Sequence, residues 1–273
     1  MEIEFLFFLF ALLITGTFSG LIAGLLGIGG GIVVIPVIFY ILDFHNFSRE
    51  ITMHVAIASS IGVIFITSFS STLAHYKLNN INFEIIKKWF FGIVLGSILG
   101  AIFASSIKTN ILILFFVIIS TLVALSMLFN RNFFISENIS KNLFLNNIIS
   151  FLIGFLSVLM GIGGGSFSVP TLSAFGKNIQ IAVGTSACLG FFIALPGFFT
   201  YVISGIFVEN LPRFSLGYVN LPIVITVACA SAVTAPIGAK ISIKVKKSLL
   251  RKFFAFFLLL ICISLVIDQY YLN

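Results

Sequence analysis

Long apolar runs dominate this chain and decide the solvent in which it folds. An α-helix needs about 20 consecutive apolar residues to cross the roughly 30 Å hydrocarbon core of a bilayer. Eight segments reach this length, and they cover residues 5–42, 52–75, 85–104, 110–129, 144–175, 181–208, 217–239 and 249–270. With 60% hydrophobic residues, 8% charged residues and a mean hydropathy of +1.22, the chain is predicted to be an all-α integral membrane protein in the lipid bilayer.

The positive net charge does not indicate nucleic-acid binding. The formal charge of +7 comes from Lys and Arg residues in short loops and at segment ends, where such residues set membrane topology. The first segment follows Glu2 and Glu4 and has no cleavage site of small residues, so we expect it to stay on the chain. Cys188, Cys229 and Cys262 lack pairing or metal-ligand spacing and are interpreted as small apolar residues. We expect no cofactor and no metal.

An unusual glycine-rich motif occurs twice. GLLGIGGGIVVIP covers residues 24–36, and VLMGIGGGSFSVP covers residues 158–170. Downstream, AIASSIG at 56–62 aligns with AVGTSAC at 182–188. Later still, GSILGA aligns with TAPIGA, at residues 96–101 and 234–239.

The order of these matches predicts a duplicated unit. We place an N-terminal repeat at residues 1–135 and a C-terminal repeat at residues 136–273, each with four hydrophobic segments. Internal repeats are common in transporters, which bind their substrate where the repeats meet. Duplication therefore favours a transport function.

The glycine runs predict a break in the first segment of each half. Each interior Gly costs a helix about 1 kcal/mol relative to Ala, so a continuous helix through GIGGG is unfavourable. In hydrocarbon the freed backbone groups need protein partners or a water-lined cavity. Helices that restart near Ile32 and Ser166 would present unpaired N–H groups, which attract anions. The alternative is that the glycines allow close helix packing, which we favour for the stripes Gly16/Gly20/Gly24 and Gly92/Gly96/Gly100.

Hydroxyl side chains follow both glycine runs at equivalent places and could donate to an oxyanion without adding charge. The alternative for these hydroxyls is bonding to carbonyls of their own helix. The candidate substrate-binding residues are Gly27, Gly29, Gly30, Gly31, Ser59, Ser60, Gly161, Gly163, Gly164, Gly165, Thr185 and Ser186.

The doubled G-[IL]-G-G-G-x₄-P element, the hydroxyl pair opening the next helix and the four-plus-four segments resemble the TauE/SafE (sulfite exporter, TSUP) family. One departure is Ser59, where the family's first pair has Thr, and this change keeps the hydroxyl. The resemblance implies a multi-pass transporter of the bacterial cytoplasmic membrane. Its implied substrates are sulfite, sulfonates and other sulfur-containing or organic anions, with export as the expected direction.

Two topologies fit the eight segments. If all eight cross the membrane, the 15 Lys and Arg residues divide nine to six between its sides. If the two glycine-containing segments enter and return on one side, only Arg49, Lys108 and Arg213 lie opposite the other twelve. The charge distribution favours re-entry, which would invert the second half relative to the first. The unequal arms of the two broken segments leave eight crossings open as the alternative.

The ionisable residues limit the mechanism. No Asp, Glu, Lys or Arg lies in the middle of an apolar segment, which argues against a buried carboxylate relay. Neither a nucleophile elbow nor an H-E-x-x-H motif occurs, so we do not expect an enzyme. A passive anion channel stays as the alternative to a carrier. The sequence does not specify the anion, the energy source or the oligomeric state.

Overall fold

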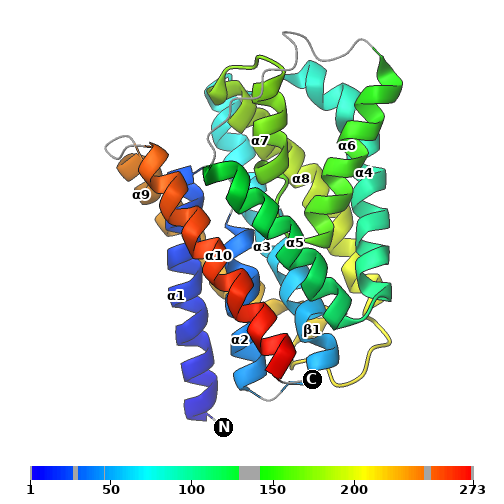
Figure 1. Ribbon diagram of the computed structural model, residues 1–273, viewed down its shortest axis with the longest axis vertical. Coiled ribbons are helices and arrows are strands. Elements are labelled where there is room, and N and C mark those ends of the chain that lie inside the picture. The colour runs from blue at the N-terminus through cyan, green and yellow to red at the C-terminus, as the bar shows by residue number, and fades with distance from the viewer. Residues whose placement is uncertain (1, 27–29, 46, 129–141, 243–246, 272–273) are drawn as a thin grey trace.

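The computed structural model describes residues 2–26, 30–45, 47–128, 142–242 and 247–271. Over these residues the protein consists of ten helices and one two-stranded antiparallel hairpin (Figure 1). The elements are α1 (Glu2–Leu26), α2 (Gly31–Phe44), α3 (Arg49–Lys77), α4 (Phe83–Ser106), α5 (Thr109–Leu128), α6 (Leu143–Leu159), α7 (Gly165–Ala174), α8 (Ile179–Ser204), β1 (Ser215–Leu216), β2 (Val219–Asn220), α9 (Leu221–Ser242) and α10 (Lys247–Tyr271). Seven of the helices are long and apolar enough to cross a bilayer, which confirms the prediction of an all-α, multi-pass membrane protein.

Both long segments break at the glycine runs. Helix α1 ends at Leu26 and α2 begins at Gly31, while α6 ends at Leu159 and α7 begins at Gly165. The eight hydrophobic segments of the sequence therefore correspond to ten helices in the described part of the chain.

The chain reverses direction at each break, so that the two flanking helices run antiparallel. The ring of Phe8, near the start of α1, packs edge-on against His45 at the end of α2, with 5.5 Å between ring centroids. In the second pair, Asn146 near the start of α6 accepts a hydrogen bond from Trp89 at the beginning of α4. Helix α7 leads into α8, where Gly184 lies against Asn80, also next to the beginning of α4. Thus α1 and α2 form one antiparallel pair, and α6 and α7 form another.

The two antiparallel pairs open toward opposite ends of the molecule (Figure 1). The chain ends and the β1–β2 hairpin lie at the end where the α1–α2 pair opens. Between the pairs lies α3, whose most apolar 18-residue window is 78% buried, against 44% or less for the other six candidate spans. An antiparallel return at each break fits the favoured re-entrant topology, which stays a prediction.

Glycine stripes let two pairs of helices approach closely. Gly16 and Gly20 of α1 face Val227, Ala230 and Ser231 of α9, so closely that a β-carbon at Gly16 would lie 2.7 Å from the Val227 carbonyl oxygen. Ser231 also donates a 2.9 Å hydrogen bond to the Gly16 carbonyl.

The same arrangement joins α4 to α6. Gly92, Gly96 and Gly100 of α4 lie directly against backbone carbonyls of Asn147, Phe151 and Phe155. The packing interpretation of the two stripes is therefore confirmed for Gly16, Gly20, Gly92, Gly96 and Gly100.

The predicted halves are not separate packing units. Helix α1 of residues 1–135 packs along α9, and α4 packs along α6 of residues 136–273. The boundary near residue 135 lies outside the described residues. The duplication itself stays a prediction.

We expect Gly96→Ala to destabilise the protein, because its methyl group would overlap the Phe151 carbonyl on α6. Overpacking of this kind costs about 1–3 kcal/mol. Thermal unfolding in detergent measures the change. Gly197→Ala is the control, because the nearest atoms to its methyl group would be side-chain methyl groups of Val158 and Ile61, the closest at 3.1 Å, and these can shift. Equal melting temperatures for both variants would contradict close packing at Gly96.

We predict that the turn after α3 faces the cytoplasm. In a background lacking Cys188, Cys229 and Cys262, a cysteine at exposed Leu78 should react with an impermeant maleimide only after cells are permeabilised. A cysteine at exposed Phe207 should react in intact cells, since both topologies place it outside. Labelling of Leu78→Cys from outside would establish eight crossings instead.

Candidate functional site

The two glycine turns meet beside the middle of α3. A β-carbon at Gly31 would lie 2.5 Å from the carbonyl oxygen of Gly161 and 3.0 Å from the hydroxyl oxygen of Ser60. One at Gly163 would touch Ile64, also on α3. Because the turns approach from opposite ends, their meeting point lies inside the protein (Figure 1).

The second turn is held by its own backbone. Gly161 and Gly164 have φ angles of 59° and 73°, a left-handed conformation that side chains disfavour. The N–H of Ile162 donates to the Ser157 carbonyl at 2.8 Å, and that of Ser168 donates to the Gly164 carbonyl at 2.7 Å. The turn thus satisfies much of its backbone locally, as hydrocarbon requires.

The first turn is held partly by a side chain. Gly30, the residue before α2, has an ordinary φ of −77°, and its carbonyl accepts a 3.1 Å hydrogen bond from Ser19 of α1. Gly27 and Gly29, also predicted as site residues, lie outside the described residues. At this turn glycine is needed for the close approach to Ser19 rather than for a left-handed backbone.

Three of the four predicted hydroxyls have protein partners. Ser60 donates to the Gly161 carbonyl at 2.8 Å and so ties α3 to the second turn. Ser59 accepts a hydrogen bond from the N–H of Asn220 at 3.0 Å, and Thr185 accepts one from the N–H of Asn82 at 2.9 Å. None of these three bonds goes to a carbonyl of the residue's own helix.

The fourth hydroxyl, Ser186, is buried and has no hydrogen-bond partner in the described part of the chain. Gly190, one turn after Ser186 on α8, lies against Gly163. Gly165 is the first residue of α7. The structure thus brings Gly31, Ser60 and Gly161 into direct contact.

Sequence reasoning missed two asparagines that support the hydroxyl pairs. Asn82 and Asn220 each cap a helix, with side-chain oxygens accepting from the N–H groups of Ile85 and Ile223. The signal was present, because extending the GSILGA–TAPIGA alignment backward places these two asparagines opposite each other. The same positions that bond Ser59 and Thr185 therefore also start α9 and α4.

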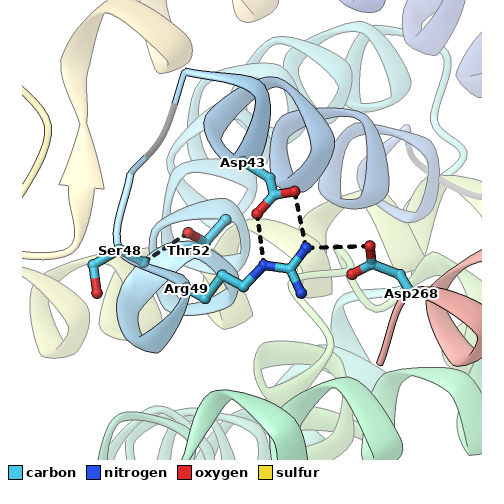
Figure 2. Close-up of polar contacts among 5 residues, drawn as sticks. All are labelled: Asp43, Ser48, Arg49, Thr52 and Asp268. Atoms are coloured by element: carbon cyan, nitrogen blue, oxygen red, sulfur yellow. Dashed lines mark hydrogen bonds and ion pairs between the residues drawn. The ribbon is translucent and has the colours of Figure 1, made fainter. Parts of the chain in front are cut away.

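A cluster of ion pairs at the open end of the first helix pair, here called the Arg49 latch, was not predicted from the sequence. Figure 2 shows Arg49, the first residue of α3, between Asp43 of α2 and Asp268 of α10. Its guanidinium forms a bidentate pair with Asp43 at 2.9 and 3.0 Å and reaches Asp268 at 3.2 Å. This planar two-bond geometry is specific to Arg and joins three helices at one end of the molecule.

No charged side chain is among the nearest contacts of the described turn glycines. These contacts are Ser19, Ile35, Ile57, Ser60, Ile64, Ser157, Ser168, Ile193 and the Gly161 carbonyl. The site therefore offers hydroxyls, backbone groups and the N-terminal end of α7. Helix N-termini and neutral donors of this kind bind anions.

These features define a class: a multi-pass helical membrane protein whose broken helices meet in its interior, as in many secondary transporters. The sequence profile described as "Sulfite exporter TauE/SafE" matches residues 12–265. The chain therefore belongs to the TauE/SafE family, and it is a membrane transporter.

Two relatives agree with this assignment. A probable membrane transporter protein of Haemophilus influenzae is 33% identical over 258 residues, covering 94% of this chain and 98% of that protein. A probable membrane transporter protein of Methanocaldococcus jannaschii is 29% identical over 252 residues, covering 92% of each. No solved structure matches the chain.

We expect Ser60→Ala and Ser186→Ala to differ in stability. The first leaves the Gly161 carbonyl buried without its donor, which costs about 1–3 kcal/mol, whereas the second removes a hydroxyl that has no partner.

If both hydroxyls also contact a bound anion such as sulfite, the double variant should lose about 1.5–3 kcal/mol of binding free energy per bond. Melting temperature and apparent sulfite affinity measure the two effects. An unchanged affinity in the double variant would show that neither serine is a ligand.

Proposed function

We propose that this protein carries small anions across the cytoplasmic membrane, with sulfite, sulfonates or related sulfur-containing or organic anions as substrates and export as the direction. The contact between the two glycine turns in the protein interior is the observation that carries this proposal. It supports a single binding region that each helix pair could open toward its own side.

The proposed binding region comprises both glycine turns and the hydroxyl pairs of α3 and α8. Backbone N–H groups and hydroxyls would replace part of the hydration shell of the anion. Ser60 has one proton, which it donates to the Gly161 carbonyl. In our proposal this bond opens when Ser60 turns to the anion, so substrate binding loosens the contact between the two turns.

The proposed cycle uses the two antiparallel helix pairs as alternating gates. Inverted arrangements allow one side to open while the other stays closed. The ion pairs of Arg49 hold α2 against α3 and α10 at the end where the first pair opens. In this conformation the latch supports a closed state on that side.

A passive anion channel is the alternative function. A channel conducts only down a gradient, whereas a carrier exchanges bound substrate between the two sides. The close contact of the turns, with 2.5 Å from a Gly31 β-carbon position to the Gly161 oxygen, favours a carrier, because a pore needs continuous open space.

We predict counterflow in proteoliposomes containing the purified protein. Vesicles preloaded with unlabelled sulfite should accumulate labelled sulfite transiently above its external concentration. This is expected because a carrier exchanges internal unlabelled sulfite for external labelled sulfite. Thiosulfate and small sulfonates, tested as competitors, would define the range of substrates. Uptake without any stimulation by internal anion would support a channel, and no sulfur-anion flux at all would reject the proposed substrates.

A further inference from the structure

Three buried serines flank the second glycine turn, and their hydroxyls have no hydrogen-bond partner in the described part of the chain. Ser157 lies near the end of α6, and Ser166 and Ser168 lie in the first turn of α7. Ser157 and Ser168 are fully buried, and Ser166 is 8% exposed. A buried hydroxyl without a partner is costly, so this group needs an explanation.

Elsewhere in the protein, buried or partly buried hydroxyls donate hydrogen bonds to carbonyl groups of their own helix. Thr15, Ser97 and Thr171 each donate to the carbonyl four residues earlier, at 2.7 Å in every case. This back-bonding is the usual fate of a helical hydroxyl. Ser157 and Ser168 do not adopt it, although both have helical neighbours that could accept.

The two hydroxyls converge on the N-terminus of α7. The Ser157 and Ser168 oxygens lie 3.6 and 3.7 Å from the position of a β-carbon on Gly164, the residue that caps this ten-residue helix. The first N–H groups of a helix lack intrahelical acceptors and carry partial positive charge. Both unpaired hydroxyl oxygens therefore lie close to one point beside the residue that caps α7, and the δ-methyl group of Ile193 covers this point in the present conformation.

The first glycine run has no hydroxyl residue at the positions that align with these serines. The alignment of the two glycine runs places Ala23 and Val34 at the positions of Ser157 and Ser168. Ser19 lies near the first turn, and its hydroxyl group donates a hydrogen bond to the Gly30 carbonyl. Of the two aligned runs, only the second thus has unpartnered buried hydroxyls at these positions.

We propose that Ser157 and Ser168 are specificity-determining ligands of the transported anion, an oxyanion with at least two acceptor oxygens. Within the binding region that both glycine turns form, these two serines beside the second turn hold the oxygens of the oxyanion. Ile193 shifts aside when the anion enters. This inference rests on the proposed transport function and adds the residues that hold the substrate.

The test compares Ser157→Ala/Ser168→Ala with Ser120→Ala, a buried and equally unpartnered serine on α5. Sulfite is the probe, and the readouts are the sulfite-induced shift in melting temperature and the apparent KM for labelled sulfite in proteoliposomes. The double variant should lose the shift and raise KM about tenfold or more per hydroxyl. Its ligand-free melting temperature should stay equal or rise, because two unpaired buried hydroxyls are gone. Ser120→Ala should keep the wild-type shift and KM.

Other outcomes would overturn the inference in distinguishable ways. If the wild type transports sulfite and the double variant keeps its KM and thermal shift, the serines are not ligands and the transport function stands. A lower ligand-free melting temperature with an unchanged KM would make them structural. If the wild type neither binds nor transports sulfite, thiosulfate or small sulfonates, the proposed function falls and this inference falls with it.

Discussion

Hydrocarbon offers no water to pair a freed backbone group, and this constraint governs how the two helix breaks can exist at all. Both breaks lie inside the protein, against the middle of the most enclosed helix, α3. The second turn bonds to its own backbone and to Ser60, while Ser19 supports the first. In the proposed mechanism, these buried turns are also where an anion replaces backbone partners.

Close helix contact fixes where the broken helices sit. Glycines of α1 and α4 admit carbonyls of α9 and α6 to distances at which a methyl group would overlap them. These contacts join a helix of residues 1–135 to a helix of residues 136–273 in each case, so the two parts of the chain pack against each other. The broken helices are thereby attached to long spans that cross the molecule, and α2 and α7 pack against α3 and α8.

The two turns share a backbone motif and differ in the side chains around it. Both use GIGGG, yet only the second is flanked by serines without partners, at Ser157 and Ser168. Unpaired buried hydroxyls reduce stability, and proteins keep such groups where a ligand can pair them. The glycine motif is thus common to both turns, whereas the serines that we propose as ligands lie beside the second turn only.

The sequence by itself determined the solvent, the helical class, the two breaks and the packing role of the glycine stripes, because hydropathy and glycine content act locally along the chain. It also paired Ser59 with Thr185 and Ser60 with Ser186 by alignment. Only the tertiary structure decided what these hydroxyls bond to, since their partners lie 101 or more residues away for Ser60, Ser59 and Thr185. The antiparallel return of α2 and α7 likewise depends on contacts between distant segments, and so does the burial of the Ser157 and Ser168 hydroxyls beside the N-terminus of α7. A local pattern marks where a helix must stop, whereas the direction in which the chain continues is set by what packs against it.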